Sequence, residues 1–174
     1  MIRRPQLLTF VFCAALAAAC SPRTKATAET ETAEPQALTA AHVADLIAAD
    51  GAAHTVAVLT GPADPTGIQK VFDGMATGDP AWLALVPAIA PETDGEYAEG
   101  LNYALSQALV HNAAGVLALI PEHGSYYFVC ADADHETARP LVAAITERSL
   151  RASRDRCLQY MDADEQELEA LEAA

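Results

Sequence analysis

Side chains that could bind a metal ion gather in one short segment, at Cys130, Asp132, Asp134, His135 and Glu136. Thiolate, imidazole and carboxylate groups at such spacing are typical metal ligands. A cysteine in a disulfide cannot serve as a thiolate ligand, however, and the remaining acids are typical of a helix start capped by Asp134. We therefore predict no metal site and no cofactor in this segment.

A histidine and a hydroxyl group lie close together in the sequence at His123 and Ser125. A nucleophile needs a base that is held in a fixed orientation, and two residues of one loop do not supply this arrangement by themselves. The sequence also contains no G-x-S-x-G motif, no HExxH motif and no phosphate-binding glycine loop. We therefore predict no catalytic residue and favour a protein that is not an enzyme.

The N-terminus has the pattern of a secretory signal peptide. Arg3 and Arg4 form a charged region, and Leu7–Ala19 is a run without any charge. A permanent membrane span needs about 20 apolar residues, so export followed by cleavage is the better interpretation.

The charge-free run ends in the sequence Leu-Ala-Ala-Ala-Cys at residues 16–20, followed by Ser21. This sequence resembles the lipobox of bacterial lipoproteins, although Ala17 stands where that family usually has Leu. The resemblance implies that residues 1–19 are removed and that the thiol of Cys20 carries a lipid such as palmitate. It also implies an outer-membrane anchor facing the periplasm, because Ser21 is not Asp. The alternative is an ordinary signal peptide that is cut after Ala19 or another small residue, with Cys20 left as an unmodified thiol.

The segment after the lipobox is polar. Residues 21–36 are mainly Ala, Thr, Glu and Pro without hydrophobic periodicity, which is typical of a flexible tether. The sequence therefore predicts a signal peptide over 1–19, a lipid-anchored flexible linker over 20–38 and a single helical domain over 39–174.

Length and charge restrict the classes of partner. The chain has 174 residues and a formal net charge of -14, from 10 Lys and Arg against 24 Asp and Glu. This length fits one domain and excludes a multidomain enzyme. Nucleic acids bind clusters of Lys and Arg, and those of this chain are few and scattered. We therefore expect no nucleic-acid partner.

The chain has four cysteines. Cys13 lies in the predicted signal peptide and Cys20 in the predicted lipid site, which leaves Cys130 and Cys157 as a pair. Two cysteines in an exported domain usually form a disulfide. The alternative is a redox or metal site built on thiols, which no CxxC motif supports. We predict a disulfide between Cys130 and Cys157.

Gly, Pro, Asn and Asp divide the chain from Leu38 onward into short helical patterns. The predicted fold is all-α, a compact bundle of six to eight short helices. The helices are expected over residues 39–49, 54–59, 66–75, 79–89, 93–109, 112–120, 134–145 and from about 153 onward. The core is expected at Trp82, Leu83, Val86, Ile89, Leu101, Leu105 and Leu109.

Several helix ends carry specific signals. Thr93 and Glu96 have the spacing of a capping box, and Asn112 can cap the helix that follows. Pro87 is expected to bend the helix over 79–89 or end it early. Pro121 is expected to end the helix that follows Asn112. Pro140 is tolerated only in the first turn of its helix.

Two segments are rich in strand-forming residues. Residues 54–59 contain Thr and Val, but their Ala-rich surroundings favour a helix. Residues 125–129, with the sequence Ser-Tyr-Tyr-Phe-Val, are expected to be extended beside Cys130. The acidic tail over 162–172 is expected to be a frayed, solvated helix end, with a cation site or a docking strip for a basic partner as the alternative.

The segment 78–83, with Asn102 to Leu109 and Asn112, resembles a loose group of short exported bacterial proteins of unassigned function. This resemblance implies a helical fold and no particular activity. We expect an envelope lipoprotein that serves as a protein-binding, structural or immunity-type module and contacts another envelope protein. The alternative is a small periplasmic hydrolase or metal-binding protein that uses His123 or His135 with nearby acids.

Overall fold

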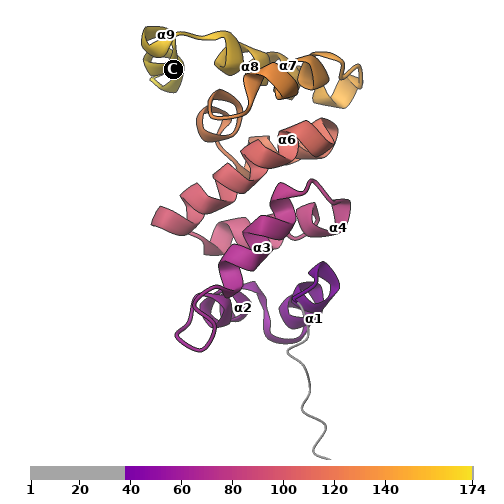
Figure 1. Cartoon of the computed structure of the whole chain (residues 1–174), viewed down its shortest axis with the longest axis vertical. Helices are drawn as coiled ribbons and strands as arrows, with labels where there is room; N and C mark the ends of the chain where they lie inside the picture. The colour runs from indigo at the N-terminus through magenta and orange to yellow at the C-terminus, as the bar shows by residue number, and fades with distance from the viewer. Residues whose placement is uncertain (1–37, 174) are drawn as a thin grey trace, which may run out of the picture. The chain divides into compact units, whose positions relative to one another are not determined.

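The computed structural model describes residues 38–173, which contain nine α-helices and no strand (Figure 1). The predicted all-α fold is confirmed. The predicted signal peptide, Cys20 and most of the predicted linker lie outside the described residues. The α-helices are α1 (Ala40–Asp50), α2 (Ala52–Leu59), α3 (Gly67–Ala76), α4 (Pro80–Leu83), α5 (Val86–Ile89), α6 (Gly95–His123), α7 (His135–Ala143), α8 (Arg151–Asp162) and α9 (Glu165–Glu172). Three shorter helical turns are η1 (Ala90–Glu92), η2 (Tyr127–Ala131) and η3 (Arg148–Leu150).

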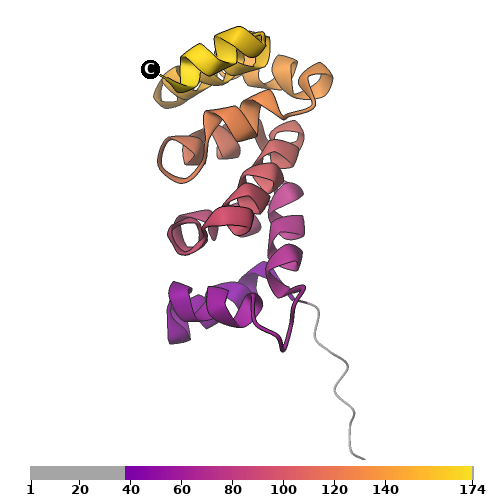
Figure 2. The same cartoon turned by 90° about the vertical axis from the view of Figure 1, so that its left-hand side faces the viewer.

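The longest helix, α6, lies between α3 on one side and the elements η2, α7 and α8 on the other (Figure 1, Figure 2). Its length and apolar composition would suffice to cross a membrane, but half of its most apolar window is buried inside the protein. This burial is typical of the core helix of a soluble domain. The predicted core is confirmed at Leu83, Val86, Ile89, Leu101, Leu105 and Leu109, whereas Trp82 is only partly buried.

The first helix lies within a residue of its predicted range, whereas the second begins two residues earlier than predicted. The Thr39 hydroxyl oxygen accepts a hydrogen bond from the backbone N–H of His42 at 3.2 Å and caps α1. Gly51 then adopts a φ of 86° between α1 and α2, a conformation that favours glycine. The residues 54–59 are helical, as expected from their surroundings.

The segment 79–89 forms two short helices, α4 and α5, and the predicted helix thus ends early, as expected from Pro87. The Asp79 carboxylate accepts a hydrogen bond from the N–H of Ala81 at 2.7 Å, which confirms the predicted cap. The helix ends at Leu83 because the ring of Pro87 would clash with the carbonyl group of Leu83 if the helix continued. Pro87 then lies in the first turn of α5.

Helix α6 joins two helices that the sequence analysis expected to be separate. Asn112 has non-helical backbone angles, φ -151° and ψ 66°, and marks a kink. Its side-chain oxygen accepts from the N–H of Gly115 at 3.0 Å, which confirms it as a cap. Its side-chain N–H donates to the carbonyl oxygen of Gly78 at 3.0 Å and so ties the kink to the turn before α4.

The expected capping box at the start of α6 is wrong. The Thr93 hydroxyl donates to the carbonyl oxygen of Ala90 at 2.9 Å, and it therefore completes the turn η1 instead of capping α6. The helix begins at Gly95, and Asp94 precedes it without a capping hydrogen bond from its side chain.

The expectations for Pro121 and Pro140 are wrong as well. Pro121 does not end its helix, because α6 continues to His123. A proline so close to the C-terminal end removes only one intrahelical hydrogen bond. Pro140 lies beyond the first turn of α7, on an exposed face, where it removes the bond to the carbonyl of Glu136.

The expected extended segment at residues 125–129 is wrong. The chain there turns into η2, a π-helix over Tyr127–Ala131 in which Val129 and Cys130 are buried. Strand propensity depends on a partner strand, and the described part of the chain offers none. Burial and the disulfide to Cys157 favour the helical turn instead.

The disulfide between Cys130 and Cys157 is confirmed, and it joins η2 to α8 with a Cα–Cα distance of 5.4 Å. The acidic tail is helical, but it forms a separate helix, α9, with its own capping box between Asp164 and Glu167. Leu168 packs against the core from this helix. The tail is therefore anchored to the protein and is not a frayed extension of α8.

Candidate interaction pocket

The groups considered for chemistry in the sequence do not form one site. His135 places its Nε2 atom 2.8 Å from the carbonyl oxygen of Ala131 and 3.1 Å from that of Cys130. A proton on this nitrogen satisfies both acceptors at the end of η2. His135 therefore fastens the end of the π-helix through its Nε2 atom.

His123 and Ser125 have separate partners as well. The Nε2 atom of His123 lies 3.9 Å from the carboxylate of Glu122. The backbone N–H of Ser125 donates to the side-chain oxygen of Asn102 at 2.8 Å. Among residues 38–173, no hydrogen bond joins His123 to Ser125, and no three His, Cys, Asp or Glu side chains are placed to hold a metal ion.

Asp132, a residue of the original cluster, lines a surface pocket. The pocket has a volume of about 390 Å³ and lies between the first half of α6 and η2. We refer to it as the aromatic–acidic pocket. Its lining residues are Glu96, Glu99, Gly100, Tyr103, Phe128 and Asp132.

Two aromatic rings are exposed at this pocket. Tyr103 is 63% exposed and Phe128 is 39% exposed, and both belong to the small group of large apolar side chains that the described residues leave open to solvent. The ring of Phe128 packs edge-on against that of Tyr127, with centroids 5.1 Å apart, which restrains its orientation. Exposed aromatic rings held in place are typical of contact surfaces for a partner.

Three carboxylates surround these rings. Glu96 and Glu99 come from α6, and Asp132 follows η2 directly. Within the described residues, neither an ion pair nor a hydrogen bond to their side chains neutralises them. The pocket therefore presents a concentrated negative charge beside apolar surface.

Three contacts fix the two elements that form the pocket. The disulfide at Cys130 and the imidazole of His135 hold η2, and the bond from Ser125 to Asn102 ties the approach to η2 onto α6. At Gly100, an added Cβ would lie 2.9 Å from the ring of Phe72. Glycine thus lets the core ring pack directly beneath the pocket.

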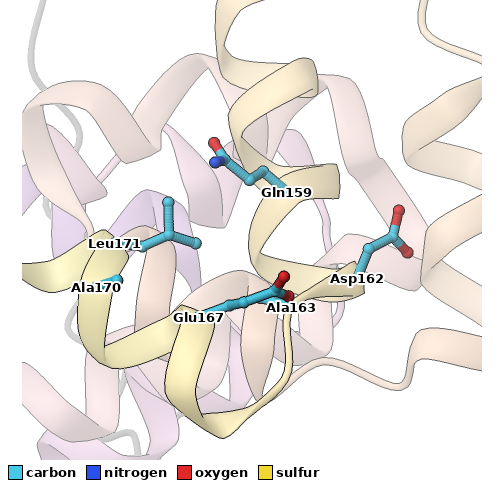
Figure 3. A pocket seen from close by; sticks show the side chains of 6 residues that line it. All are labelled: Gln159, Asp162, Ala163, Glu167, Ala170 and Leu171. Carbon is cyan, nitrogen blue, oxygen red and sulfur yellow. The ribbon is translucent and has the colours of Figure 1, made fainter.

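A second pocket, of about 400 Å³, lies between α8 and α9 (Figure 3). Asp162 at its rim receives two hydrogen bonds from Arg139, at 2.6 and 2.7 Å. The Arg139 guanidinium lowers the pKa of Asp162 and neutralises its charge. Glu167, also in this pocket, is engaged in the capping box of α9. Asp162 and Glu167 are therefore already engaged in contacts within the protein.

Of the residues that line the aromatic–acidic pocket, only Asp132 was among the candidates predicted from the sequence. The spacing of Glu96, Glu99 and Tyr103 places them on one face of a helix, a signal that was available in the sequence. Phe128 could not be placed beside them, because its segment was expected to be extended.

Comparisons with known proteins identify no relative from which a site could be transferred. Inferences about function therefore depend on the residues of this chain. No protein-family model, no curated protein and no solved structure matches the chain.

Proposed function

We propose that the protein is a lipid-anchored module of the bacterial cell envelope whose folded domain binds another envelope protein. The observation that carries the proposal is the aromatic–acidic pocket, in which Tyr103 and Phe128 remain exposed on a rigid support. Burial of apolar surface is favourable, so a partner that covers these two rings would gain binding free energy.

The envelope location is supported by two features of different origin. Residues 16–20 resemble a lipobox, and Ser21 after the cysteine fits transport to the outer membrane. The disulfide between Cys130 and Cys157 fits an oxidising compartment such as the periplasm. Lipid on Cys20 would hold the domain at the membrane surface, where a protein partner is confined to the same layer.

The test compares the tagged full-length protein with its Cys20→Ala variant in the native cell. We expect the wild type to partition with membranes, whereas C20A loses this partitioning because it lacks the acylated thiol. Crosslinking in intact cells should then enrich the same envelope protein with the wild type in repeated experiments. Membrane partitioning of C20A equal to that of the wild type would contradict the lipid anchor, and the absence of any enriched protein would contradict the binding function.

A further inference from the structure

We propose that the aromatic–acidic pocket binds a lysine or arginine side chain from a basic segment of the partner protein. This inference rests on the proposed protein-binding function and names the chemistry of the partner. It follows from the combination of exposed rings with carboxylates that no cation of the described residues neutralises.

A cation satisfies both features of the pocket at once. The faces of Tyr103 and Phe128 carry negative charge density that attracts an ammonium or guanidinium group. Glu99 and Asp132 add carboxylates within the same pocket. The combined attraction is stronger than either contribution at an exposed site, because the rings exclude part of the water that weakens ionic contacts.

The protein already contains an arginine bound in this way. The guanidinium carbon of Arg156 lies 5.5 Å from the ring centre of Tyr126 and 5.7 Å from that of Tyr160. The two rings are nearly parallel, with an interplanar angle of 15°. The aromatic–acidic pocket offers two rings as well, with carboxylates added, but its cation must come from another molecule.

A lysine or arginine side chain fits the pocket better than the ammonium group of a lipid. Both side chains have apolar stems that can lie along the rings of Tyr103 and Phe128 while their charged ends reach the carboxylates. A zwitterionic lipid headgroup would bring a phosphate close to Glu96 and Glu99 and be repelled. The acidic surface as a whole also attracts a basic partner from a distance.

The pocket between α8 and α9 does not share this chemistry. Its lining contains no aromatic side chain, and Arg139 already occupies the carboxylate of Asp162. It therefore supplies a control for attraction by acidic surface alone. Glu169 on α9 is suited to this purpose, because it is exposed and lies outside the aromatic–acidic pocket.

The experiment measures binding of short fluorescent peptides to the mature protein in a non-ionic detergent. The peptides have the same Gly-Ser spacing and carry three arginines, three lysines, three glutamines or three glutamates. We expect binding of the arginine and lysine peptides, which weakens with added salt, and no binding of the other two. Replacing Tyr103→Ala or Phe128→Ala should weaken binding by about fivefold or more, and Glu99→Gln should act in the same direction.

Two matched variants control for charge and apolar surface. Glu169→Gln removes the same charge as E99Q, and Leu141→Ala removes an exposed apolar side chain from α7. Both should change the affinity less than twofold. Equal weakening by E169Q and E99Q would overturn the proposal, because binding would then follow the net charge. Circular dichroism checks that every variant keeps its helices.

Other occupants would give different results. Binding to phosphatidylethanolamine vesicles that Y103A abolishes, without binding to the basic peptides, would overturn the proposal in favour of a lipid headgroup. If the basic peptides do not bind while in-cell crosslinking still captures one envelope protein, the protein-binding function stands and this inference fails. If neither result is obtained, both fail.

Discussion

At the scale of single residues, some carboxylates form ion pairs that stabilise the fold, whereas those of the candidate site have no such partner among the described residues. Asp162 receives two hydrogen bonds from Arg139 and links α8 to α7. The carboxylates of Glu99 and Asp132 line a pocket with no such partner among the described residues. Similar residue types thus stabilise the fold in one place and leave a negative charge at a pocket in the other.

The ion pair between Arg139 and Asp162 predicts how the stability of the protein depends on pH. Its hydrogen bonds hold the pKa of Asp162 below the ordinary value. A carboxyl group with a lowered pKa in the folded state stabilises the protein above its unfolded pKa, near 4, and this contribution is lost as the pH falls through the folded pKa. We therefore expect Asp162→Asn to be less stable than the wild type at pH 7, with a difference that shrinks below about pH 4.

Urea unfolding at several pH values between 7 and 3 measures this difference in the free energy of unfolding. The difference should be small, because Arg139 and Asp162 are both about half exposed and solvent screens them. Asp45→Asn is a suitable control, since Asp45 is an exposed residue of α1 outside any ion pair of the described residues. A difference for D162N that stays constant over the whole pH range would contradict the prediction.

At the scale of elements, tertiary contacts set the path of the backbone at the points where helices meet. The kink of α6 at Asn112 is tied to Gly78, which lies 34 residues earlier in the chain. Gly78 has a φ of 72°, and an added Cβ would lie 2.7 Å from the Cβ of His111. The turn before α4 therefore fits the kink only with glycine at this position.

The packing of α3 against α4 gives a second prediction. An added Cβ at Gly74 would overlap the ring of Trp82. Inside a helix, alanine is more favourable than glycine by about 1 kcal/mol. We nevertheless expect Gly74→Ala to lower the stability of the protein, because the ring of Trp82 must move to make room for the added methyl group. In a Trp82→Ala background, the same substitution should instead stabilise the protein by up to about 1 kcal/mol.

A double-mutant cycle with urea unfolding separates the two effects of this substitution. The coupling energy between G74A and W82A reports the contact between the helices, while helix propensity alone would give no coupling. The close packing of α3 and α4 would be contradicted if G74A raised the stability of both backgrounds equally.

At the scale of the whole molecule, the buried disulfide limits the freedom of the unfolded chain. Cys130 and Cys157 are separated by 27 residues, and both are fully buried. The bond also joins η2, the element that carries Phe128, to α8. It therefore contributes to stability and to the geometry of the aromatic–acidic pocket together.

Replacing both cysteines, Cys130→Ala with Cys157→Ala, should lower the free energy of unfolding by about 3.5 kcal/mol in the chain-entropy model. That is a large part of the roughly 5–15 kcal/mol of a typical domain. Urea unfolding of the double variant and of the wild type with a reducing agent should give similar values. A loss below about 1 kcal/mol for the double variant would contradict the expected role of the bond.

Local sequence signals determined the helical class, most helix starts and the pairing of the two cysteines. Thr39, Asp79 and Asn112 form caps through neighbouring backbone groups, so their role is visible from a few residues. The apolar positions of α6 follow the helical period and are buried as expected. The pairing of Cys130 with Cys157 was predictable because these are the two cysteines of the predicted domain and the predicted compartment favours a disulfide.

Only the tertiary structure decided the conformation of residues 125–129 and the position of the pocket. Phe128 lines the same pocket as Tyr103 because burial of Val129, the disulfide at Cys130 and the imidazole of His135 favour a π-helix over an extended segment. These contacts join residues that are distant in sequence or depend on the complete packing. Local propensity does not contain them, since strand-forming residues adopt whichever conformation their neighbours in space can satisfy.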